Sequence, residues 1–175
     1  MRRFWPRAES NMYGAAKSLV DHGLATARRE LNGRRPTTVY SITDEGRKAL
    51  SDWVVQPVAS NPVLEFEALL KIFFSDHGTK EGVRQQLFET RAWAQAALAN
   101  GTEIANGYLF DQGPFRERLP QVRLIFKLIW DYHELMNRWV DWALNEIDGY
   151  GEDPAGWPDQ LDVFSDAVES STVSR

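Results

Sequence analysis

Residues 33–50, GRRPTTVYSITDEGRKAL, decide the fold. Their first half is rich in β-branched and aromatic residues that alternate with a period of two, which is typical of a strand. Asn32 and Gly33 form a turn signal at the start of this stretch, because both residue types tolerate positive φ. Thr43, followed by two acidic residues, opens a helix with a hydroxyl cap. The stretch therefore predicts a hairpin turn, a strand and a capped helix in direct succession.

The residues upstream add a short helix and the first strand of a basic ribbon. Leu24–Arg28 is predicted as that strand, so that residues 24–42 form a two-stranded ribbon with four arginines near its tip. Before it, apolar residues at helical spacing between Met12 and Leu19 predict a helix, and Gly23 supplies the left-handed residue at which helices commonly stop. A helix with small and amide side chains suits a major groove, and an arginine-tipped ribbon suits contact with phosphates.

Basic and acidic residues are unevenly divided along the chain. The 175 residues hold 20 Lys and Arg against 25 Asp and Glu, a net charge of −5. Residues 1–50 carry 10 of the basic and 5 of the acidic residues, whereas residues 51–175 carry 10 and 20. A basic segment joined to an acidic one indicates separate roles, with the basic segment facing a polyanion.

The remainder of the chain is predicted to be helical. Asn61 and Pro62 form a cap and a first helical position, and long helices are expected over residues 80–110, capped by Thr79, and 120–147. Each long helix is apolar on more than one face, so the two need each other and a second chain to cover this surface. The sequence therefore predicts a homodimer formed through residues 80–147.

Composition and motifs exclude several classes of protein. An apolar share of 43% permits a buried core, and the lack of cysteine excludes a disulfide scaffold, an iron–sulfur cluster and a thiol nucleophile. No apolar run approaches the roughly 18 residues of a membrane span, and no signal peptide opens the chain. His22, His77 and His133 are scattered, and no phosphate loop or catalytic set occurs. We expect a cytoplasmic protein that is not an enzyme and needs no metal or cofactor.

The order of helix, Gly-Leu, basic ribbon and capped helix resembles the PadR family of transcriptional regulators, a winged-helix group. The matching stretches are Phe4-Trp5-Pro6, Tyr13 to Leu24 and, most specifically, residues 33–50. The segment from Pro62 to the predicted 120–147 helix resembles the helical dimerisation domain of the longer PadR subgroup. The resemblance implies a mainly α fold with one β-hairpin, in which a partial winged helix-turn-helix precedes long dimerisation helices.

This resemblance implies three segments and a function. A winged-helix DNA-binding domain is expected over residues 1–57, a helical dimerisation domain over 58–150 and a loosely attached tail over 151–175. The function implied is that of a transcriptional repressor that binds double-stranded operator DNA as a homodimer and responds to a small aromatic or phenolic ligand. The two recognition helices of the dimer would enter successive major grooves, about 34–36 Å apart.

The resemblance also assigns roles to residues. It implies a recognition helix over Ala8–His22 and a wing over Leu24–Ile42. Tyr13 matches a position that mostly packs the helix and that also lies within reach of a phosphate. The residues expected to contact DNA are Arg7, Ser10, Asn11, Tyr13, Lys17, Arg34, Arg35 and Thr37.

The tryptophans suggest a second site. Seven are present, and Trp93, Trp130 and Trp139 lie on the two predicted long helices. Aromatic faces at a dimer interface hold flat ligands in drug-binding PadR members, so these three tryptophans are candidate ligand contacts. Packing in an apolar core explains the same residues.

Two departures from the family pattern bear on function. Ala16 stands where the family usually has a larger apolar residue. The two helices that open the winged-helix domain in family members are not found before this stretch, so the DNA-binding head is expected to be incomplete. The residues expected to lose most of their cover are Leu19, Leu24, Tyr40, Ile42 and Leu50. The alternative function is therefore that of a truncated helical dimerisation or ligand-sensing protein without independent DNA binding.

Overall fold

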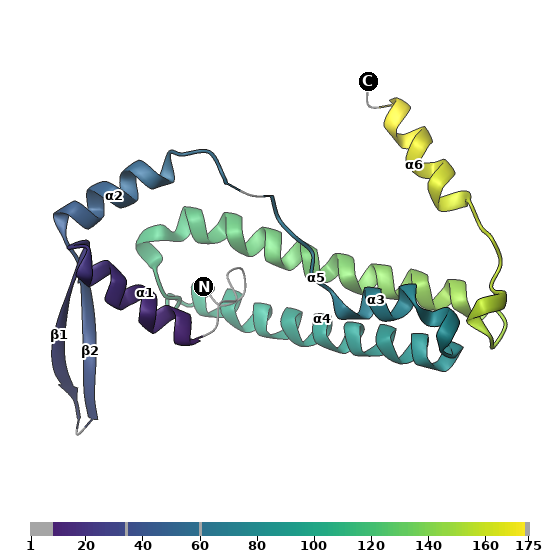
Figure 1. Cartoon of the computed structure of the whole chain (residues 1–175), viewed down its shortest axis with the longest axis horizontal. Coiled ribbons are helices and arrows are strands. Elements are labelled where there is room, and N and C mark those ends of the chain that lie inside the picture. The colour runs from purple at the N-terminus through teal and green to yellow at the C-terminus, as the bar shows by residue number, and fades with distance from the viewer. Residues whose placement is uncertain (1–8, 34, 60, 174–175) are drawn as a thin grey trace. The chain divides into compact units, whose positions relative to one another are not determined.

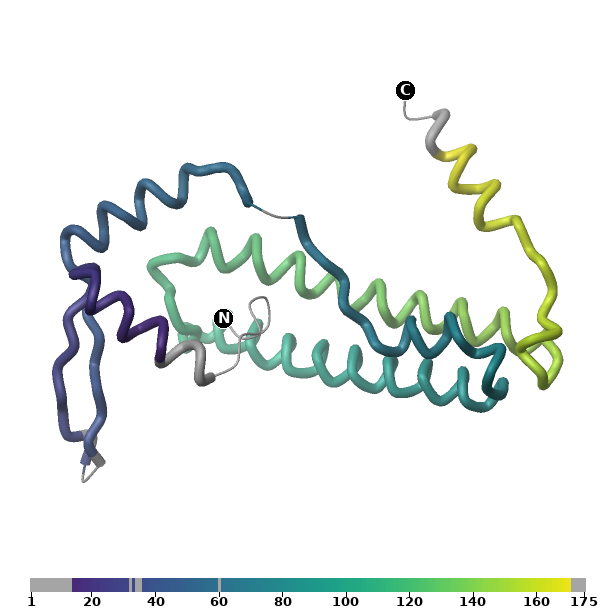
Figure 2. The backbone as a smooth tube through the Cα atoms, in the orientation of Figure 1, coloured from purple at the N-terminus to yellow at the C-terminus, as the bar shows by residue number. Residues whose placement is uncertain are grey.

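The computed structural model describes residues 9–33, 35–59 and 61–173 and divides the chain into two compact units (Figure 1, Figure 2). Unit 1, Met1–Val63, contains α1 (Glu9–Asp21), β1 (Ala25–Asn32), β2 (Arg35–Ile42) and α2 (Asp44–Val54). Unit 2, Leu64–Arg175, contains α3 (Glu67–Phe73), α4 (Lys80–Leu109), α5 (Leu119–Asp148), α6 (Asp162–Val173) and 3-10 turns at Ser75–His77, Arg116–Arg118 and Pro154–Gly156. Within the described residues, the predicted class of a mainly helical fold with one two-stranded hairpin is confirmed.

Helix α1 ends at the predicted left-handed glycine. Gly23 has a φ of 70°, and the amide of Leu24 donates to the carbonyl of Leu19 at 2.8 Å. Glycine adopts this backbone without the steric cost that a Cβ would add, so the chain turns directly into β1.

Strands β1 and β2 pair antiparallel along the full eight residues of each strand. The turn between them contains Gly33 with a φ of 65°, as the Asn-Gly signal predicted. The first strand is longer than the predicted residues 24–28, because pairing with the β-branched second strand carries it through a stretch with weak alternation of its own.

Thr43 joins the end of α1, the hairpin and α2. Its Oγ1 donates to the carbonyl of Gly23 at 2.8 Å and accepts from the amide of Gly46 at 3.0 Å, and its amide donates to the carbonyl of Leu24 at 3.1 Å. A Cβ at Gly46 would overlap that Leu24 carbonyl oxygen. A residue without a side chain is therefore required where α2 closes on the base of the ribbon.

Unit 1 buries very little. Among its residues whose burial is described, Gly46 alone is buried, while Leu19 is 47% and Leu50 48% exposed. These elements are therefore held together mainly by backbone hydrogen bonds and by the hydrogen bonds of Thr43.

The predicted helix start at Asn61 and Pro62 is wrong. Residues 61–66 carry no helix, and α3 begins at Glu67 without a side-chain cap. Phe66 is extended and places its ring edge-to-face against Trp139, with 6.3 Å between the centroids. Tertiary packing of this ring outweighs the local start signal.

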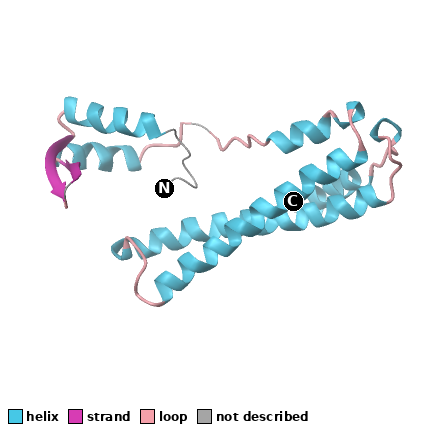
Figure 3. Ribbon diagram, turned by 90° about the horizontal axis from the view of Figure 1, so that it is seen from below, coloured by secondary structure: helices cyan, strands magenta, loops and turns pink. Residues whose placement is uncertain are grey.

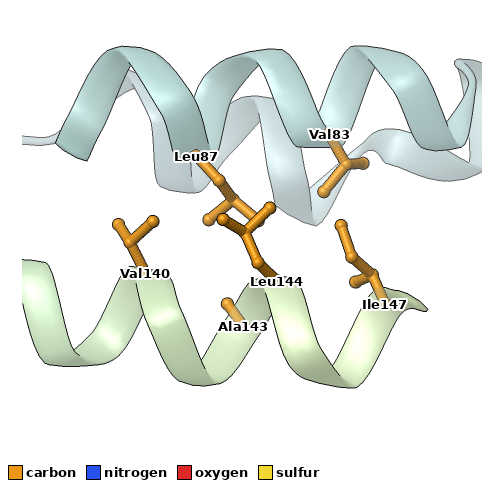
Figure 4. Close-up of a cluster of buried hydrophobic side chains, with 6 residues drawn as sticks. All are labelled: Val83, Leu87, Val140, Ala143, Leu144 and Ile147. Atoms are coloured by element: carbon orange, nitrogen blue, oxygen red, sulfur yellow. The ribbon is translucent and has the colours of Figure 1, made fainter. Parts of the chain in front are cut away.

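Helices α4 and α5 lie side by side and run antiparallel (Figure 1, Figure 3). Their bounds agree with the predicted 80–110 and 120–147 to within one residue, and Thr79 caps α4 by accepting from the amide of Gly82 at 3.1 Å. The core of the hairpin lies toward the start of α4 and the end of α5 (Figure 4). It consists of Val83, Leu87, Val140, Ala143, Leu144 and Ile147.

Lys80 closes this end of the hairpin. It is 8% exposed, and its Nζ donates to the carbonyls of Tyr150 at 2.7 Å and Asp148 at 3.3 Å. The ammonium thus satisfies carbonyls at the end of α5, where the helix dipole favours a positive charge. Trp157 packs against the same core and its Nε1 donates to the carbonyl of Gly151 at 2.8 Å, so the segment after α5 is held at least as far as Trp157.

Candidate functional site

The ribbon of unit 1 presents a polar face. The register places Thr37 opposite Glu30 and Val39 opposite Arg28, and side chains two apart on a strand share a face, so Arg28 and Thr37 lie on the same side. Arg28 pairs with Glu30, and its side chain is 80% exposed. An exposed pair of this kind contributes little stability, so the guanidinium is available to exchange the carboxylate for a phosphate.

Helix α1 presents a second polar surface. Lys17 and Ser18 are exposed, as are Gly14 and Ala15. The small residues leave the backbone of this helix accessible to a large partner. His22 closes the helix by a contact of 2.7 Å between its Nδ1 and the carbonyl of Ser18.

The DNA contacts predicted from the sequence fall into three groups. Lys17 and Thr37 are exposed on α1 and β2. The helix and strand assignments cover four more residues, whose side chains the structure does not describe: Ser10, Asn11, Tyr13 and Arg35. Arg7 and Arg34 lie outside the described residues.

Unit 2 contains a groove of about 220 Å³ between α3 and α4. Its aromatic walls are Phe66 and Trp93. The other lining residues are Glu67, Ala68, Lys71, Gln86, Glu89 and Thr90. The volume lies below the roughly 300–1,000 Å³ of sites for drug-sized ligands, so the groove suits a ligand of one or two rings.

Polar side chains around the groove are mostly paired within the chain. Lys71 contacts Glu67 at 3.0 Å across one turn of α3, and the side-chain amide of Gln85 donates to Glu89 at 2.8 Å. Thr90 is buried and donates to the carbonyl of Gln86 at 2.8 Å. The groove thus has aromatic walls, and the charged side chains at its border form exposed pairs that a polar ligand could replace.

The three candidate tryptophans occupy different surroundings. Trp93 lines the groove and contacts the rings of Tyr132 and His133, with centroid separations of 6.1 and 4.8 Å. Trp139 does not line the groove, but its ring contacts Phe66, which does. Trp130 instead stacks on Phe126 at 5.8 Å and packs against Gly101 of α4. Trp93 therefore lines the groove, Trp139 contacts one of its walls, and Trp130 does neither.

Sequence reasoning missed Phe66 and the charged lining residues of the groove. The Asn61-Pro62 signal places Phe66 in a helix that does not form there, so its contact with Trp139 has no sequence signal. The sequence places Arg28 near the ribbon tip but does not by itself pair it with the face of Thr37, and the register set by the Asn32-Gly33 turn is the signal that brings them together. No group of three or more metal-ligating residues lies together in the described part of the chain, and none of its helices is long and apolar enough to cross a membrane.

Comparison with protein families and solved structures finds proteins similar to this chain. The family model described as "Virulence activator alpha C-term" matches residues 66–148, which contain the whole of α3, α4 and α5. The negative transcriptional regulator PadR of Bacillus subtilis is 30% identical over 73 residues, which cover 41% of this chain and 40% of that protein. The matched stretch thus spans well under half of this curated relative.

Solved structures match over a larger share of the chain. B. subtilis PadR in complex with operator DNA has a TM-score of 0.64 at 20% identity, covering 83% of this chain and 82% of that one. The same protein in complex with p-coumaric acid has a TM-score of 0.63 at 20% identity, with coverage of 83% and 82%. The Vibrio cholerae virulence activator AphA has a TM-score of 0.60 at 26% identity, with coverage of 83% and 81%.

Proposed function

We propose that the chain is a transcriptional regulator of the PadR type: a homodimeric, DNA-binding repressor that responds to a small aromatic ligand. The observation that carries the proposal is the joined order of α1, ribbon and α2 in a basic N-terminal unit. It stands in a chain of which 83% matches the fold of a PadR structure solved with operator DNA, and this supports the proposal. The regulator acts on DNA in the cytoplasm.

DNA binding is assigned to α1 and the ribbon. Helix α1 exposes Lys17 beside small residues, which suits entry into a major groove. The ribbon carries Arg28 and Thr37 on one face, with Arg35 at its tip, and these contact phosphates. In this assignment α1 reads base edges, and the ribbon fixes the register of the protein on the duplex.

Homodimer formation is assigned to the outer face of α5. Leu128, Leu135 and Trp142 recur at intervals of seven residues and are exposed, as is Leu124 one turn before Leu128. We call these four residues the α5 stripe. A seven-residue apolar repeat on an exposed helix is the pattern with which two helices pack lengthwise. A second copy of the chain satisfies this repeat with an identical helix.

Ligand binding is assigned to the groove between α3 and α4, with Trp93 and Phe66 as ring contacts. Phe66 also touches Trp139, whose neighbours along α5 belong to the stripe. A ligand that moves Phe66 is therefore linked to the dimer face, and through it to the spacing of the two DNA-binding units. The B. subtilis PadR complex with p-coumaric acid supports the class of ligand.

Selection from a pool of random DNA duplexes tests the proposal. We expect enrichment of an inverted repeat whose half-sites are separated by about one helical turn, because a two-fold dimer reads a two-fold site. Enrichment of a single half-site would contradict the dimer, and no enrichment would favour the alternative function as a helical dimerisation or ligand-sensing protein without independent DNA binding.

Titration with p-coumaric acid tests the ligand response. We expect the acid to quench tryptophan fluorescence and to weaken binding to the selected duplex over the same concentration range. Trp93→Phe should remove most of the quenching, whereas Trp130→Phe serves as the matched control away from the groove. Quenching that leaves DNA binding unchanged would contradict the coupling.

A further inference from the structure

The ribbon of unit 1 contains a single acidic residue among its arginines. Residues 25–42 carry four arginines, and Glu30 is the only acid among them. Glutamate is depleted in strands, and a negative charge opposes the contact with phosphates that we assign to this ribbon. The presence of Glu30 in the ribbon therefore needs an explanation of its own.

Glu30 lies on the polar face of the ribbon, beside Arg28. The two residues are two apart on β1, so their side chains share a face and begin about 7 Å apart along the strand. They form an ion pair, in which the side chain of Arg28 is 80% and that of Glu30 40% exposed. The residues opposite them on β2 are Val39 and Thr37, which carry no charge. The pair is therefore neutral as a whole, and no charge lies directly across the ribbon from it.

Stability of the fold does not account for this carboxylate. The acids at the start of α2 have a structural explanation, because Asp44 and Glu45 lie in its first turn, where the helix dipole favours a negative charge. Asp44 also pairs with Arg47 at 3.2 Å. Glu30 instead lies within a strand, and an exposed ion pair contributes little to folding. A role in the contact with DNA is the remaining explanation.

The ion pair changes what Arg28 contributes to a complex with DNA of arbitrary sequence. Such binding depends on attraction between cationic side chains and phosphates. A phosphate that attracts the Arg28 guanidinium also repels the Glu30 carboxylate, and two unit charges about 7 Å apart in water repel each other enough to lower affinity about threefold. While it is paired with Glu30, Arg28 therefore adds little to non-specific binding.

A complex on the operator uses the same arginine differently. In the assignment above, the contacts of α1 with base edges fix the position of the ribbon against the duplex. Exchange of the Glu30 carboxylate for a phosphate then costs little, because the pair is exposed and weak. The guanidinium gains a charge-assisted hydrogen bond to a phosphate that is already in place, and the carboxylate turns to solvent. Arg28 therefore contributes to operator binding.

We propose that Glu30 is a specificity-determining residue, whose carboxylate neutralises Arg28 on arbitrary DNA and releases it when α1 is seated on the operator. Glu30 acts through Arg28 and is thus a positioning residue. A repulsive element directed against the wrong partner is a general route to specificity. This inference rests on the proposed DNA binding by α1 and the ribbon, and goes beyond it by naming the residue that lowers non-specific binding.

Glu30→Gln in the full chain tests the proposal, because it removes the charge and keeps the size of the side chain. Binding is measured across a salt series on the duplex enriched in the selection above and on a duplex of the same composition in scrambled order. On the scrambled duplex we expect about tenfold tighter binding, from about threefold at each of the two ribbons of a dimer. The salt slope should steepen by close to two units, because each freed Arg28 neutralises one more phosphate.

The selected duplex should respond less to Glu30→Gln. We expect its affinity to change less than about threefold and its salt slope to stay that of the parent, because Arg28 contacts a phosphate there in both proteins. Glu45→Gln is the matched control, since it removes the same charge from an exposed residue of unit 1 outside the ribbon, and should leave both slopes unchanged.

The double variant Arg28→Ala with Glu30→Gln tests whether the carboxylate acts through the guanidinium. Compared with Arg28→Ala alone, it should show no tighter binding to the scrambled duplex. Tightening without Arg28, equal tightening on both duplexes, or no change in Glu30→Gln would overturn the role of Glu30 alone, in a parent chain that binds DNA. A parent chain that binds neither duplex would overturn the proposed DNA binding, and this inference with it.

Discussion

Lys80 provides the most demanding test of the packing in unit 2. In Lys80→Met the side chain keeps most of its volume, but the carbonyls of Asp148 and Tyr150 lose their ammonium donor. Hydrogen bonds to a charged group contribute roughly 1.5–3 kcal/mol each. The contact with Asp148 is long, at 3.3 Å, and the Glu152 carboxylate lies 3.9 Å from Nζ on the surface, where it contributes little. We therefore expect a loss of about 2–4 kcal/mol in the free energy of unfolding.

Urea unfolding followed by tryptophan fluorescence measures this loss. Trp157 packs beside Tyr150 at a centroid separation of 5.2 Å and reports on this end of the hairpin. Measurements at one protein concentration keep any contribution of dimer formation constant. Lys71→Met is the matched control, because Lys71 makes an exposed pair with Glu67, and its substitution should cost less than about 1 kcal/mol. Equal losses in the two variants would refute the reasoning.

Three further substitutions test other packing contacts of the fold. Gly46→Ala should destabilise unit 1 by about 1–3 kcal/mol, since the new methyl group meets the Leu24 carbonyl; amide hydrogen exchange in the ribbon measures this, and unchanged protection would contradict it. Gly101→Leu should lower the urea midpoint and change the near-UV dichroism, because a Cβ there already lies 3.1 Å from the Trp130 ring; an unchanged spectrum would count against that packing. Burial is the largest cause that raises the pKa of Tyr150, and the Glu146 carboxylate is the next. The neutral Tyr150 hydroxyl therefore contributes its full stability below the ordinary pKa of 10.0, and this stability is lost as the pH rises above that value. In alkaline urea titrations Tyr150→Phe should therefore lose less stability than the parent chain, and parallel losses would disprove the role of this hydroxyl.

Much of the fold could be predicted from local signals that the structure retains. The Asn32-Gly33 turn, the Thr43 cap and the left-handed Gly23 each specify their backbone through a few neighbouring atoms, and all three are found as expected. The long helices were equally predictable, because caps and breaks mark both of their ends. What failed was the start of α3, where the Asn61-Pro62 signal competed with the packing of Phe66 on Trp139.

The candidate site was less predictable for the same reason. The wing arginines and the exposed position of Lys17 follow from strand and helix periodicity. The groove depends on which residues of α3 meet which residues of α4, and no pattern in the sequence encodes that pairing. Trp93 and Trp130 are both tryptophans of the long helices, yet of the two only Trp93 lines the groove.

Binding of the full chain to duplex DNA across a salt series tests the central claim most directly. We expect measurable affinity at low salt and a steep linear fall of log K with log salt concentration, because cationic side chains displace counterions from phosphates. The double variant Arg28→Ala with Lys17→Ala should bind more weakly and with a shallower slope, by close to one unit for each phosphate that the variant no longer neutralises. A chain that dimerises but shows no salt-dependent binding, or a double variant with the parent slope, would contradict DNA recognition by α1 and the ribbon.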